Sequence, residues 1–549
     1  MTLNFPFVTM RQYGSWAIVF FAAIAAVAAF LQALDYPFVS DDMAYVVDNY
    51  KLANLSLSEL WRLISEPYNP YEFLPLRDLS YWIDITLFGL NPSAYRLHNI
   101  VLYLFCLPLV YVTTMELWKY FRPAESSSAS WVAAAVTALF VIHPAHVEPV
   151  VWISSRKDIL STMFSMFALW FSLKTKRKNG LSASYASATL IALLAAMMSK
   201  ATAVAVAPII AILWVFFWRE ISIQDRQRIQ LLWPVSVLLL AIGVVLIFSI
   251  NSAVKVTPYF GVEVITRALA VLGWLVRLVV SPESRHFIYP VFEGPYLPLM
   301  VTFGLAVLVS AFISLLMIVK KPTLEGFAVI AFVLLCIPYI QLIPYKTASL
   351  VSDRFLSIAV WPALLLIVSL SWRLKHMTRM ILLLAIALVW IFQTAERTKD
   401  WRSYEALWEA DYRDYPEHYL PAYEKITMYQ LTKGKFREAD QVANKISFPE
   451  ARNIMKKIVE VAKGMKDISS TGDPLEVMDY LHDLEQLLIH PPEQVKWDPT
   501  LEYFWTESMS SFVLVWQDLV KRFPDYPQVR LNARKSLMNA LKYGDASTQ

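Results

Sequence analysis

Residues 14–42 read GSWAIVFFAAIAAVAAFLQALDYPFVSDD, an apolar run followed by two adjacent carboxylates, Asp41 and Asp42. About 20 residues at helical rise cross the hydrocarbon core of a bilayer, so this run predicts a membrane span. Arg11 precedes the run, but the run is long for a signal peptide. We therefore expect an uncleaved first helix with the two carboxylates just beyond its end.

Further apolar runs of spanning length continue through the first 394 residues. Together with the first run they predict an all-α, polytopic membrane helix bundle of about eleven spans. They lie near 97–118, 130–145, 158–173, 181–199, 201–218, 231–250, 297–319, 323–343, 355–372 and 377–394.

Charge divides the chain into two parts. Residues 395–549 hold 21 basic and 25 acidic residues, out of 49 and 45 in the whole chain. This tail is as charged as a soluble domain, whereas residues 1–394 are depleted of charge. We expect a transmembrane domain at 1–394 and a soluble helical domain at 395–549, which excludes a wholly soluble or disordered protein. The net charge of +4 implies no nucleic-acid partner, and both cysteines, Cys106 and Cys336, lie in apolar runs, which excludes a disulfide framework.

Basic clusters mark the cytoplasmic side of a membrane protein. Eleven spans with a cytoplasmic N-terminus put these clusters inside if 263–281, which Arg267 and Arg277 interrupt, is a re-entrant or interfacial helix of the outer face. The tail is then extracytoplasmic, in a multi-pass protein of the cytoplasmic (inner) membrane. The clusters are Arg11; Lys119 and Arg122; Lys174, Lys176, Arg177 and Lys178; Arg219, Arg226 and Arg228; Lys320 and Lys321; and Arg373, Lys375 and Arg379.

Most remaining ionisable residues of the membrane part fall on the outer side, in the first outer loop at 35–96 and in later outer segments. Such groups are costly at a membrane boundary unless they are paired or lie in a wet cavity, so their convergence predicts a functional site. Ordinary interfacial charge explains any one of them alone. Asp41 or Asp42 is suited to act as a general base, and an Asp here also suits an N-cap of the segment that follows. The sequence does not decide which of the two is the base.

The cations of the outer segments are suited to bind a phosphate at the lipid surface, and snorkelling anchors are the alternative. Lys157 belongs to this group. The predicted donor-phosphate ligands are Arg354, Arg77, Lys346 and Arg156, and the predicted acceptor or sugar ligands are His143, His146, Glu148, Asp78, Asp353 and His286.

His143 and His146 stand three residues apart with Glu148 close by, so a metal site has to be considered. Pro144 and Pro149 interrupt the helix here, which weakens the argument that the two imidazoles share a face. We favour hydrogen-bonding or structural histidines, and we expect neither a metal nor another cofactor.

The tail is predicted to be helical throughout. Residues 418–446, HYLPAYEKITMYQLTKGKFREADQVANKI, resemble one tetratricopeptide unit, with a turn at Gly434. Residues 515–541 suggest a second, looser helix pair. One unit is too few for a free-standing solenoid, so we expect the tail to pack on the outer face of the bundle, either to bind a protein acceptor or to serve as a lid or brace.

Six blocks, taken in order, resemble the membrane-embedded O-mannosyltransferases that carry tetratricopeptide repeats, including their bacterial relatives. These enzymes are similar to the protein O-mannosyltransferases of the glycosyltransferase C superfamily. The blocks are VSDDMAYVVDN (39–49), PLRDLSYWIDITLFGLNPSAYRLHN (75–99), FVIHPAHVEPVVWISSRKDIL (140–160), WLVRLVVSPESRHFIYP (274–290), SLVSDRFLSIAVWP (349–362) and TKDWRSYEALWEADYRDYP (398–416).

The resemblance implies a glycosyltransferase C fold, a polyprenyl-phosphate-linked sugar donor, catalysis on the non-cytoplasmic face and an acidic base in the first outer loop. Asp41 and Asp42 match the family's acidic pair, Arg354 matches the arginine after its late acidic position, and His143 and His146 match its histidine block. Members of this family usually carry many tetratricopeptide repeats, whereas this chain has one recognisable repeat.

The sequence thus predicts an inverting, integral-membrane glycosyltransferase. Its acceptor is expected to be a hydroxyl, such as Ser or Thr of an exported protein that contacts the tail, with a lipid or glycan acceptor as a variant. The alternative from another class is a non-enzymatic transporter or assembly factor for lipid-linked glycans.

Overall fold

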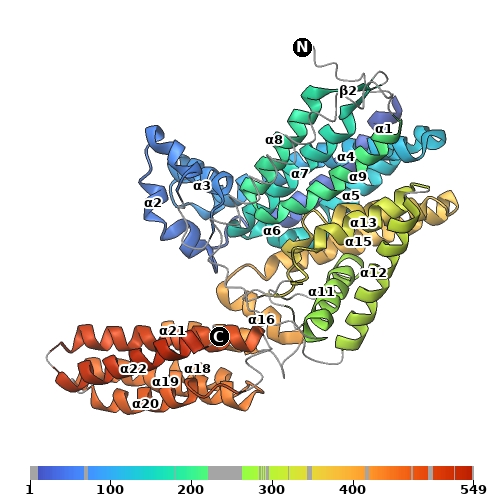
Figure 1. The fold of residues 1–549 in the computed structure, drawn as a ribbon. Coiled ribbons are helices and arrows are strands. Elements are labelled where there is room, and N and C mark those ends of the chain that lie inside the picture. Colours follow the sequence, from blue (N-terminus) through green and yellow to red (C-terminus); the bar gives the residue numbers. More distant parts are fainter. Residues whose placement is uncertain are drawn as a thin grey trace.

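The computed structural model describes residues 10–66, 72–177, 180–220, 262–282, 286, 289, 291, 296–318, 321–342, 349–414, 420–471, 474–492, 499–524 and 526–546. Within these residues the regular structure is helical, apart from a two-residue antiparallel pairing of β1 (Lys176–Arg177) with β2 (Gly180–Leu181). The predicted all-α fold class is confirmed. The helices form a large bundle and a separate layer of tail helices (Figure 1).

Every predicted span within the described residues coincides with a helix of the bundle; the predicted span at 231–250 lies outside them. Five described stretches are long and apolar enough to cross a membrane: Gly14–Leu31, Pro92–Phe121, Pro123–Val141, Leu297–Ile318 and His376–Arg402. The bundle helices are α1 (Met10–Leu31), α4 (Pro92–Phe121), α5 (Ala129–Val141), α7 (Arg156–Thr175), α8 (Ala183–Ser199), α9 (Val206–Glu220), α12 (Leu297–Ile318), α13 (Leu324–Cys336), α14 (Val360–Ser371) and α15 (His376–Lys399).

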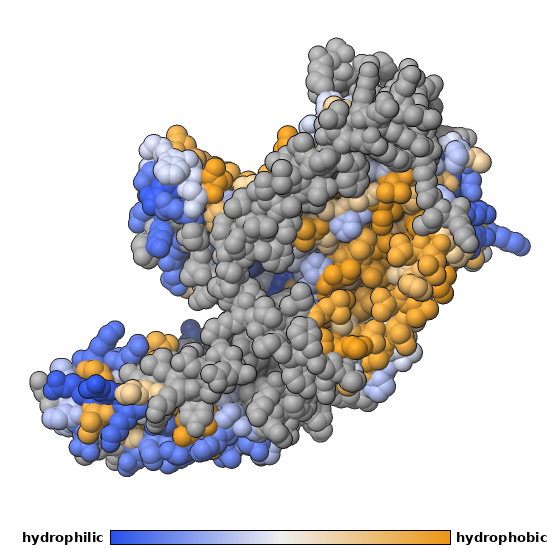
Figure 2. Space-filling model, in the orientation of Figure 1, coloured by the Kyte–Doolittle hydropathy of each residue, from blue (hydrophilic) through white to orange (hydrophobic). Residues whose placement is uncertain are grey.

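A broad apolar surface covers one face of the bundle where α12 and α15 lie (Figure 2). Phe312 and Leu316 on α12 and Leu384 and Phe392 on α15 are among its exposed side chains. An apolar surface of this extent suits contact with lipid, and helices satisfy their own backbone groups there. The chain is a multi-pass membrane protein.

Helix α11 (Val262–Val280) covers the segment predicted to be re-entrant or interfacial. It runs antiparallel to α12 in direct backbone contact, since a Cβ on Gly273 would lie 1.9 Å from the Met300 carbonyl oxygen and a Cβ on Gly304 2.0 Å from that of Leu269. Only glycine permits so close an approach. The choice between a re-entrant and an interfacial helix stays a prediction.

The ends of three bundle helices meet in one polar network. Glu325, at the start of α13, pairs with Arg122, which follows α4, and with Arg373, which follows α14, at 3.3 Å. Ser369 donates a hydrogen bond to the same carboxylate at 2.9 Å. These ends therefore share one face of the bundle, as the predicted placement of Arg122 and Arg373 on one side requires.

The first outer loop folds into short helices beside the bundle: the π-helical turn η1 (Met43–Val47), α2 (Tyr50–Ala53), the 3-10 helix η2 (Leu57–Ile64) and α3 (Pro75–Phe88). A small core of its own includes Val46, Leu52, Tyr81 and Tyr95. The Tyr81 hydroxyl donates to the carbonyl of Ile153 at 2.8 Å, which ties this loop to the segment before α7.

The tail consists of α16 (Tyr404–Asp414), α17 (Leu420–Thr432), α18 (Phe436–Ala443), α19 (Pro449–Thr471), α20 (Leu475–Leu488), α21 (Pro499–Arg522) and α22 (Pro527–Ala546). Gly434, at φ +70°, lies in the turn between α17 and α18, where the sequence places the turn of a repeat unit. Helices α21 and α22 correspond to the second predicted pair. Of the tail helices, α16 lies beside the bundle (Figure 1). Just before α16 in the chain, Trp401 stacks on Trp152 with 5.6 Å between the ring centroids.

Candidate functional site

The two adjacent carboxylates, Asp41 and Asp42, point into different surroundings. Asp42 is fully buried, and it accepts hydrogen bonds from the Ser154 backbone N–H at 2.8 Å, the Ser154 hydroxyl at 2.5 Å and the Val39 N–H at 3.1 Å. Its carboxylate makes no N-cap hydrogen bond to η1. Asp41 is exposed. Ser40, with φ +54°, precedes the pair in a conformation that few non-glycine residues adopt. Such strain is characteristic of functional sites.

Burial governs the protonation of both carboxyls. It raises the pKa of Asp42 to about 6, although the hydrogen bonds from Ser154 and Val39 act in the opposite direction. Asp41 is open to solvent on one side but has many protein atoms around it, and this partial desolvation raises its pKa too. The positive charges of Lys157 and then Arg354 counteract that rise. Asp41 is therefore an accessible carboxylate of raised basicity on which the charges of two cations act.

Tyr45 lies between Asp41 and a group of cations. Its backbone N–H donates to the Asp41 carbonyl at 2.9 Å. Its ring centre lies 4.9 Å from the Arg77 guanidinium carbon and 5.6 Å from the Lys157 ammonium. One turn of η1 thus brings two cations next to the acidic pair.

Glu72 holds these cations together. It accepts from the Lys157 ammonium on both oxygens, at 2.8 and 2.7 Å, and from Arg77 at 2.7 Å. Arg77 also pairs with Asp78 at 2.8 Å. Because of Lys157 and Arg77, the pKa of Glu72 falls to about 2 in spite of its desolvation, so this carboxylate stays ionised. Lys200 continues the group through its ion pair with Asp158 at 2.5 Å.

Arg156, predicted as a phosphate ligand, is fully buried beside the Tyr81 ring, which the Arg77 guanidinium also approaches, at 6.0 Å. It pairs with Asp84 at 2.5 Å and donates to the Asn99 side chain at 2.6 Å, and its guanidinium lies 5.0 Å from the Tyr81 ring centre. Asp84 belongs to α3, Asn99 to α4 and Arg156 to α7. These contacts of Arg156 join three helices, and its predicted role at the donor phosphate stays a prediction.

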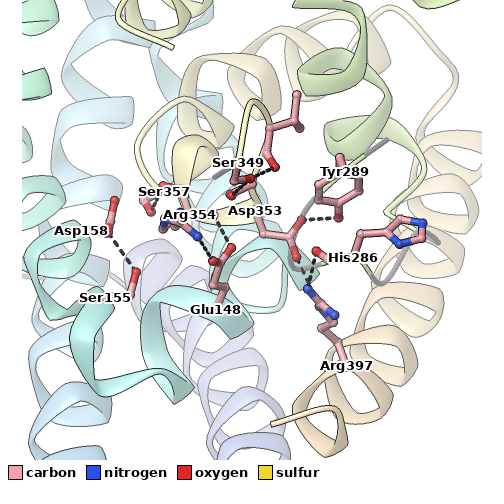
Figure 3. Close-up of polar contacts among 12 residues, drawn as sticks. Glu148, Ser155, Asp158, His286, Tyr289, Ser349, Asp353, Arg354, Ser357 and Arg397 are labelled. Atoms are coloured by element: carbon pink, nitrogen blue, oxygen red, sulfur yellow. Dashed lines mark hydrogen bonds and ion pairs between the residues drawn. The ribbon is translucent and has the colours of Figure 1, made fainter. Parts of the chain in front are cut away.

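Glu148 and Arg354 form a second charged group (Figure 3). Glu148 lies on α6 (Val147–Val151) and is fully buried, and Arg354 lies on η7 (Asp353–Leu356). The carboxylate accepts from the Arg354 backbone N–H at 2.9 Å and pairs with its guanidinium. The guanidinium also lies 5.2 Å from the Trp152 ring centre. These contacts fix the position of Arg354, whose positive charge lowers the pKa of Asp41.

Asp353, beside Arg354 in the chain, points the other way (Figure 3). It accepts from the Tyr289 hydroxyl at 2.7 Å and pairs with Arg397 at 3.3 Å. Burial raises the pKa of Asp353 to about 6. Arg397 also donates to the backbone carbonyl of His286 at 2.8 Å. The structure therefore places Asp353 and His286 together at the entry to the tail.

His143 and His146 link separate parts of the bundle. One ring nitrogen of His143 lies 3.1 Å from the Val279 carbonyl of α11, and one of His146 lies 3.0 Å from the Ser357 carbonyl after η7. Burial lowers the pKa of His143 to about 3 and that of His146 to about 4, so both rings are neutral at physiological pH. Among the described residues, no three His, Cys, Asp or Glu side chains gather in a way that could hold a metal ion.

The structure also adds residues that the sequence did not single out. Glu72 lies just before a quoted block but belongs to no motif, and Arg397 looks like an ordinary charge at the end of a span. Their ion pairs with residues distant in sequence, Glu72 with Lys157 and Arg397 with Asp353, show their importance. Lys346, the remaining predicted phosphate ligand, lies outside the described residues. What the site offers chemically is a solvent-accessible carboxylate, Asp41, that pairs with none of the described cations, together with cations that can stabilise an anion.

The resemblance inferred from the sequence motifs is confirmed by comparison with curated proteins, although no family model matches the chain. The chain is 25% identical over 162 residues to a protein O-mannosyl-transferase of Caenorhabditis elegans, which is 28% of this chain and 22% of that protein. It is 27% identical over 148 residues to protein O-mannosyl-transferase TMTC3 of Homo sapiens, 26% of this chain and 15% of that one. It is 28% identical over 189 residues to protein O-mannosyl-transferase Tmtc1 of Drosophila melanogaster, which is 33% of this chain and 20% of that protein.

The matched segments thus span less than a quarter of these relatives' own lengths. Among solved structures, that of ArnT from Cupriavidus metallidurans in the apo state aligns with a TM-score of 0.40 at 13% identity, covering 95% of this chain and 78% of that chain.

Proposed function

We propose that the chain is an integral-membrane glycosyltransferase. It moves one sugar, as a mannosyltransferase would, from a polyprenyl-phosphate carrier to a hydroxyl of an acceptor. The acceptor is Ser or Thr of an exported protein, and the reaction takes place on the non-cytoplasmic face of the cytoplasmic membrane. The curated relatives named as O-mannosyl-transferases support the reaction class. The observation that carries the proposal is the exposed Asp41 carboxylate, whose pKa the positive charges of Lys157 and Arg354 lower.

In this mechanism Asp41 is the general base. The acceptor oxygen forms a bond to C1 of the sugar while the bond between C1 and the phosphate oxygen breaks. The hydroxyl proton passes to Asp41, and the electron pair leaves with the polyprenyl phosphate. A single displacement of this kind inverts the anomeric centre. Lys157 and Arg354 stabilise the negative charge that develops on the leaving phosphate.

Asp42 positions the base and does not exchange protons with the acceptor. Its three hydrogen bonds fix the turn between Val39 and η1 against Ser154. The lipid-linked sugar is a substrate, and the proposal includes no metal or other cofactor. The tail, whose Lys425 is among the charges that act on Asp41, is proposed to contact the acceptor.

The test uses the full chain in lipid nanodiscs with a polyprenyl-phosphate mannose and Ser- or Thr-containing peptides. We expect Asp41→Asn to abolish transfer at unchanged thermal stability. Asp48→Asn is the matched control, because Asp48 is an exposed carboxylate of the same loop just past η1. Full transfer by Asp41→Asn would refute the assignment of the base.

A second experiment identifies the product. Intact masses of exported proteins, compared with and without the gene, are expected to differ by the mass of one or more hexoses. Unmodified exported proteins, together with lipid-linked sugar that fails to reach the outer face, would instead support the transporter alternative.

A further inference from the structure

Five described cations, among them the three whose charges act on Asp41, are each paired with a carboxylate. A lipid phosphate carries negative charge of its own, so it competes with these carboxylates for the cations, and it binds most strongly to a cation whose carboxylate gives up its place. The pairs are Arg77 with Glu72 at 2.7 Å and Asp78 at 2.8 Å, Lys157 with Glu72 at 2.7 Å, Lys200 with Asp158 at 2.5 Å, Lys425 with Glu424 at 3.3 Å, and Arg354 with Glu148.

Exposure singles out Glu72 as the carboxylate that can leave. Its side chain is 32% exposed, whereas the other partner carboxylates, Glu424, Asp78, Asp158 and Glu148, are 7%, 5%, 2% and 0% exposed. A buried carboxylate that loses its cation remains as an uncompensated buried charge. Glu72 already touches water, so it can turn outward and become hydrated.

The two cations that Glu72 bridges would respond differently to its departure. Arg77 is fully buried and keeps its pair with Asp78. Lys157 is 12% exposed, and Glu72 is the carboxylate with which its ammonium pairs. An anion that replaces Glu72 would therefore bind chiefly to Lys157, from the side that is open to solvent.

Lys157 lies where the proposed reaction needs the phosphate. Its ammonium is 5.6 Å from the ring centre of Tyr45, whose N–H donates to the Asp41 carbonyl at 2.9 Å. The charge of Lys157 also acts on the Asp41 carboxyl, whose pKa it lowers. Glu72 thus occupies the ammonium that the proposed mechanism assigns to the leaving phosphate.

We propose that Glu72 is an exchangeable counter-ion that occupies the donor-phosphate position on Lys157 and is displaced when the lipid phosphate binds. This inference rests on the proposed function for the identity of the anion. In the absence of donor, Glu72 keeps Lys157 paired and correctly placed. When the donor binds, its phosphate takes over the ion pair with Lys157.

The experiment measures the dissociation constant of farnesyl monophosphate on the full chain in nanodiscs, with farnesol as the phosphate-free control. Glu72→Gln removes a charge that competes with the phosphate and keeps the size of the side chain. We expect it to tighten binding of farnesyl monophosphate about tenfold, the factor that about 1.4 kcal/mol of relieved competition gives, and to leave farnesol binding unchanged. In a Lys157→Met background, Glu72→Gln is expected to give no such gain.

Glu66→Gln is the matched control. Glu66 lies on the same outer loop and pairs with Arg62 at 2.8 Å, so this variant changes the net charge equally without touching Lys157. An equal gain from Glu66→Gln, unchanged or weaker binding by Glu72→Gln, or a gain that persists without Lys157 would each overturn the proposal.

A second measurement needs no variant. Farnesyl monophosphate, but not farnesol, is expected to increase labelling of Glu72 by a water-soluble carbodiimide and an amine, read by peptide mass, and unchanged labelling would contradict the exchange. The two proposals fail separately. If Glu72→Gln binds farnesyl monophosphate more tightly but the unmodified chain transfers no sugar, the proposed function alone is refuted. If the unmodified chain transfers sugar but Glu72→Gln does not change binding, the exchange alone is refuted.

Discussion

Replacing each carboxylate of the acidic pair by alanine is expected to separate a positioning role from a catalytic one. Asp42→Ala removes the acceptor of two backbone N–H groups, those of Val39 and Ser154, and of the Ser154 hydroxyl. Each buried donor left without a partner costs about 1–3 kcal/mol. The hydroxyl can turn to another acceptor, so only the two N–H groups count, and together they are expected to lower the free energy of unfolding by about 2–6 kcal/mol.

Part of this loss in the free energy of unfolding is offset, because Asp42→Ala also removes a buried carboxylate. Burial raises the pKa of Asp42 to about 6, which means that the folded protein holds its charged form at a disadvantage. Removing the carboxylate relieves this disadvantage at neutral pH, so we expect a net destabilisation in the lower part of the range, about 2–4 kcal/mol. Asp41→Ala removes an exposed side chain and is expected to change stability by no more than about 0.5 kcal/mol.

The assay is thermal unfolding of the full chain in detergent, followed by intrinsic tryptophan fluorescence, with sugar transfer measured on the same preparations. Asp42→Ala is expected to lower the unfolding temperature by several degrees and to reduce transfer. Asp41→Ala is expected to unfold at the temperature of the unmodified chain and to lack transfer. Equal unfolding temperatures for the two variants, or a larger fall for Asp41→Ala, would refute the division of roles.

Three further results are expected. The rate of transfer should fall with decreasing pH as Asp41 takes up a proton, and the midpoint of this fall should lie above the pKa of about 3.9 of an ordinary aspartate. Lys157→Met removes a positive charge that lowers the pKa of Asp41, so it should move the midpoint of the pH–rate profile to higher pH. Gly273→Ala should destabilise the bundle by about 1–3 kcal/mol in thermal unfolding, because its Cβ would meet the Met300 carbonyl oxygen at 1.9 Å; an unchanged unfolding temperature would contradict the close packing of α11 on α12. Trp401→Ala, which removes the stack on Trp152, should speed proteolytic separation of tail and bundle, and equal cleavage rates would argue against this contact as the link.

Much of the fold could be predicted from local sequence. The spans were predicted because an apolar run of membrane length has few alternatives to a helix. The glycine turn between α17 and α18 was predicted for a similar reason, since a short turn imposes its own backbone requirement. The packing of α11 along α12 was not predicted, because it depends on Gly273 and Gly304 meeting the backbone of another helix.

The candidate site was predicted in its composition but not in its pairing. Cations on the outer side suggested a phosphate site, yet Arg156 has Asp84 as its partner, and Lys157, outside the main set of predicted ligands, lies next to Tyr45. The role of Glu72 could not be predicted from the sequence, because a single glutamate in a loop belongs to no motif or periodic pattern. Ion pairing depends on which helices meet, and hydrophobic periodicity does not encode that.

The sequence by itself determined a membrane bundle with a charged tail and an acidic pair beyond the first span, because these follow from the length and polarity of consecutive residues. Only the tertiary structure distinguished Asp41 from Asp42. The two are the same residue type at adjacent positions, and what separates them is Ser154, 112 residues away, which encloses one carboxylate and leaves the other open to solvent. Burial and charge neighbours set the chemistry of a carboxyl group, and both arise only when distant segments pack together.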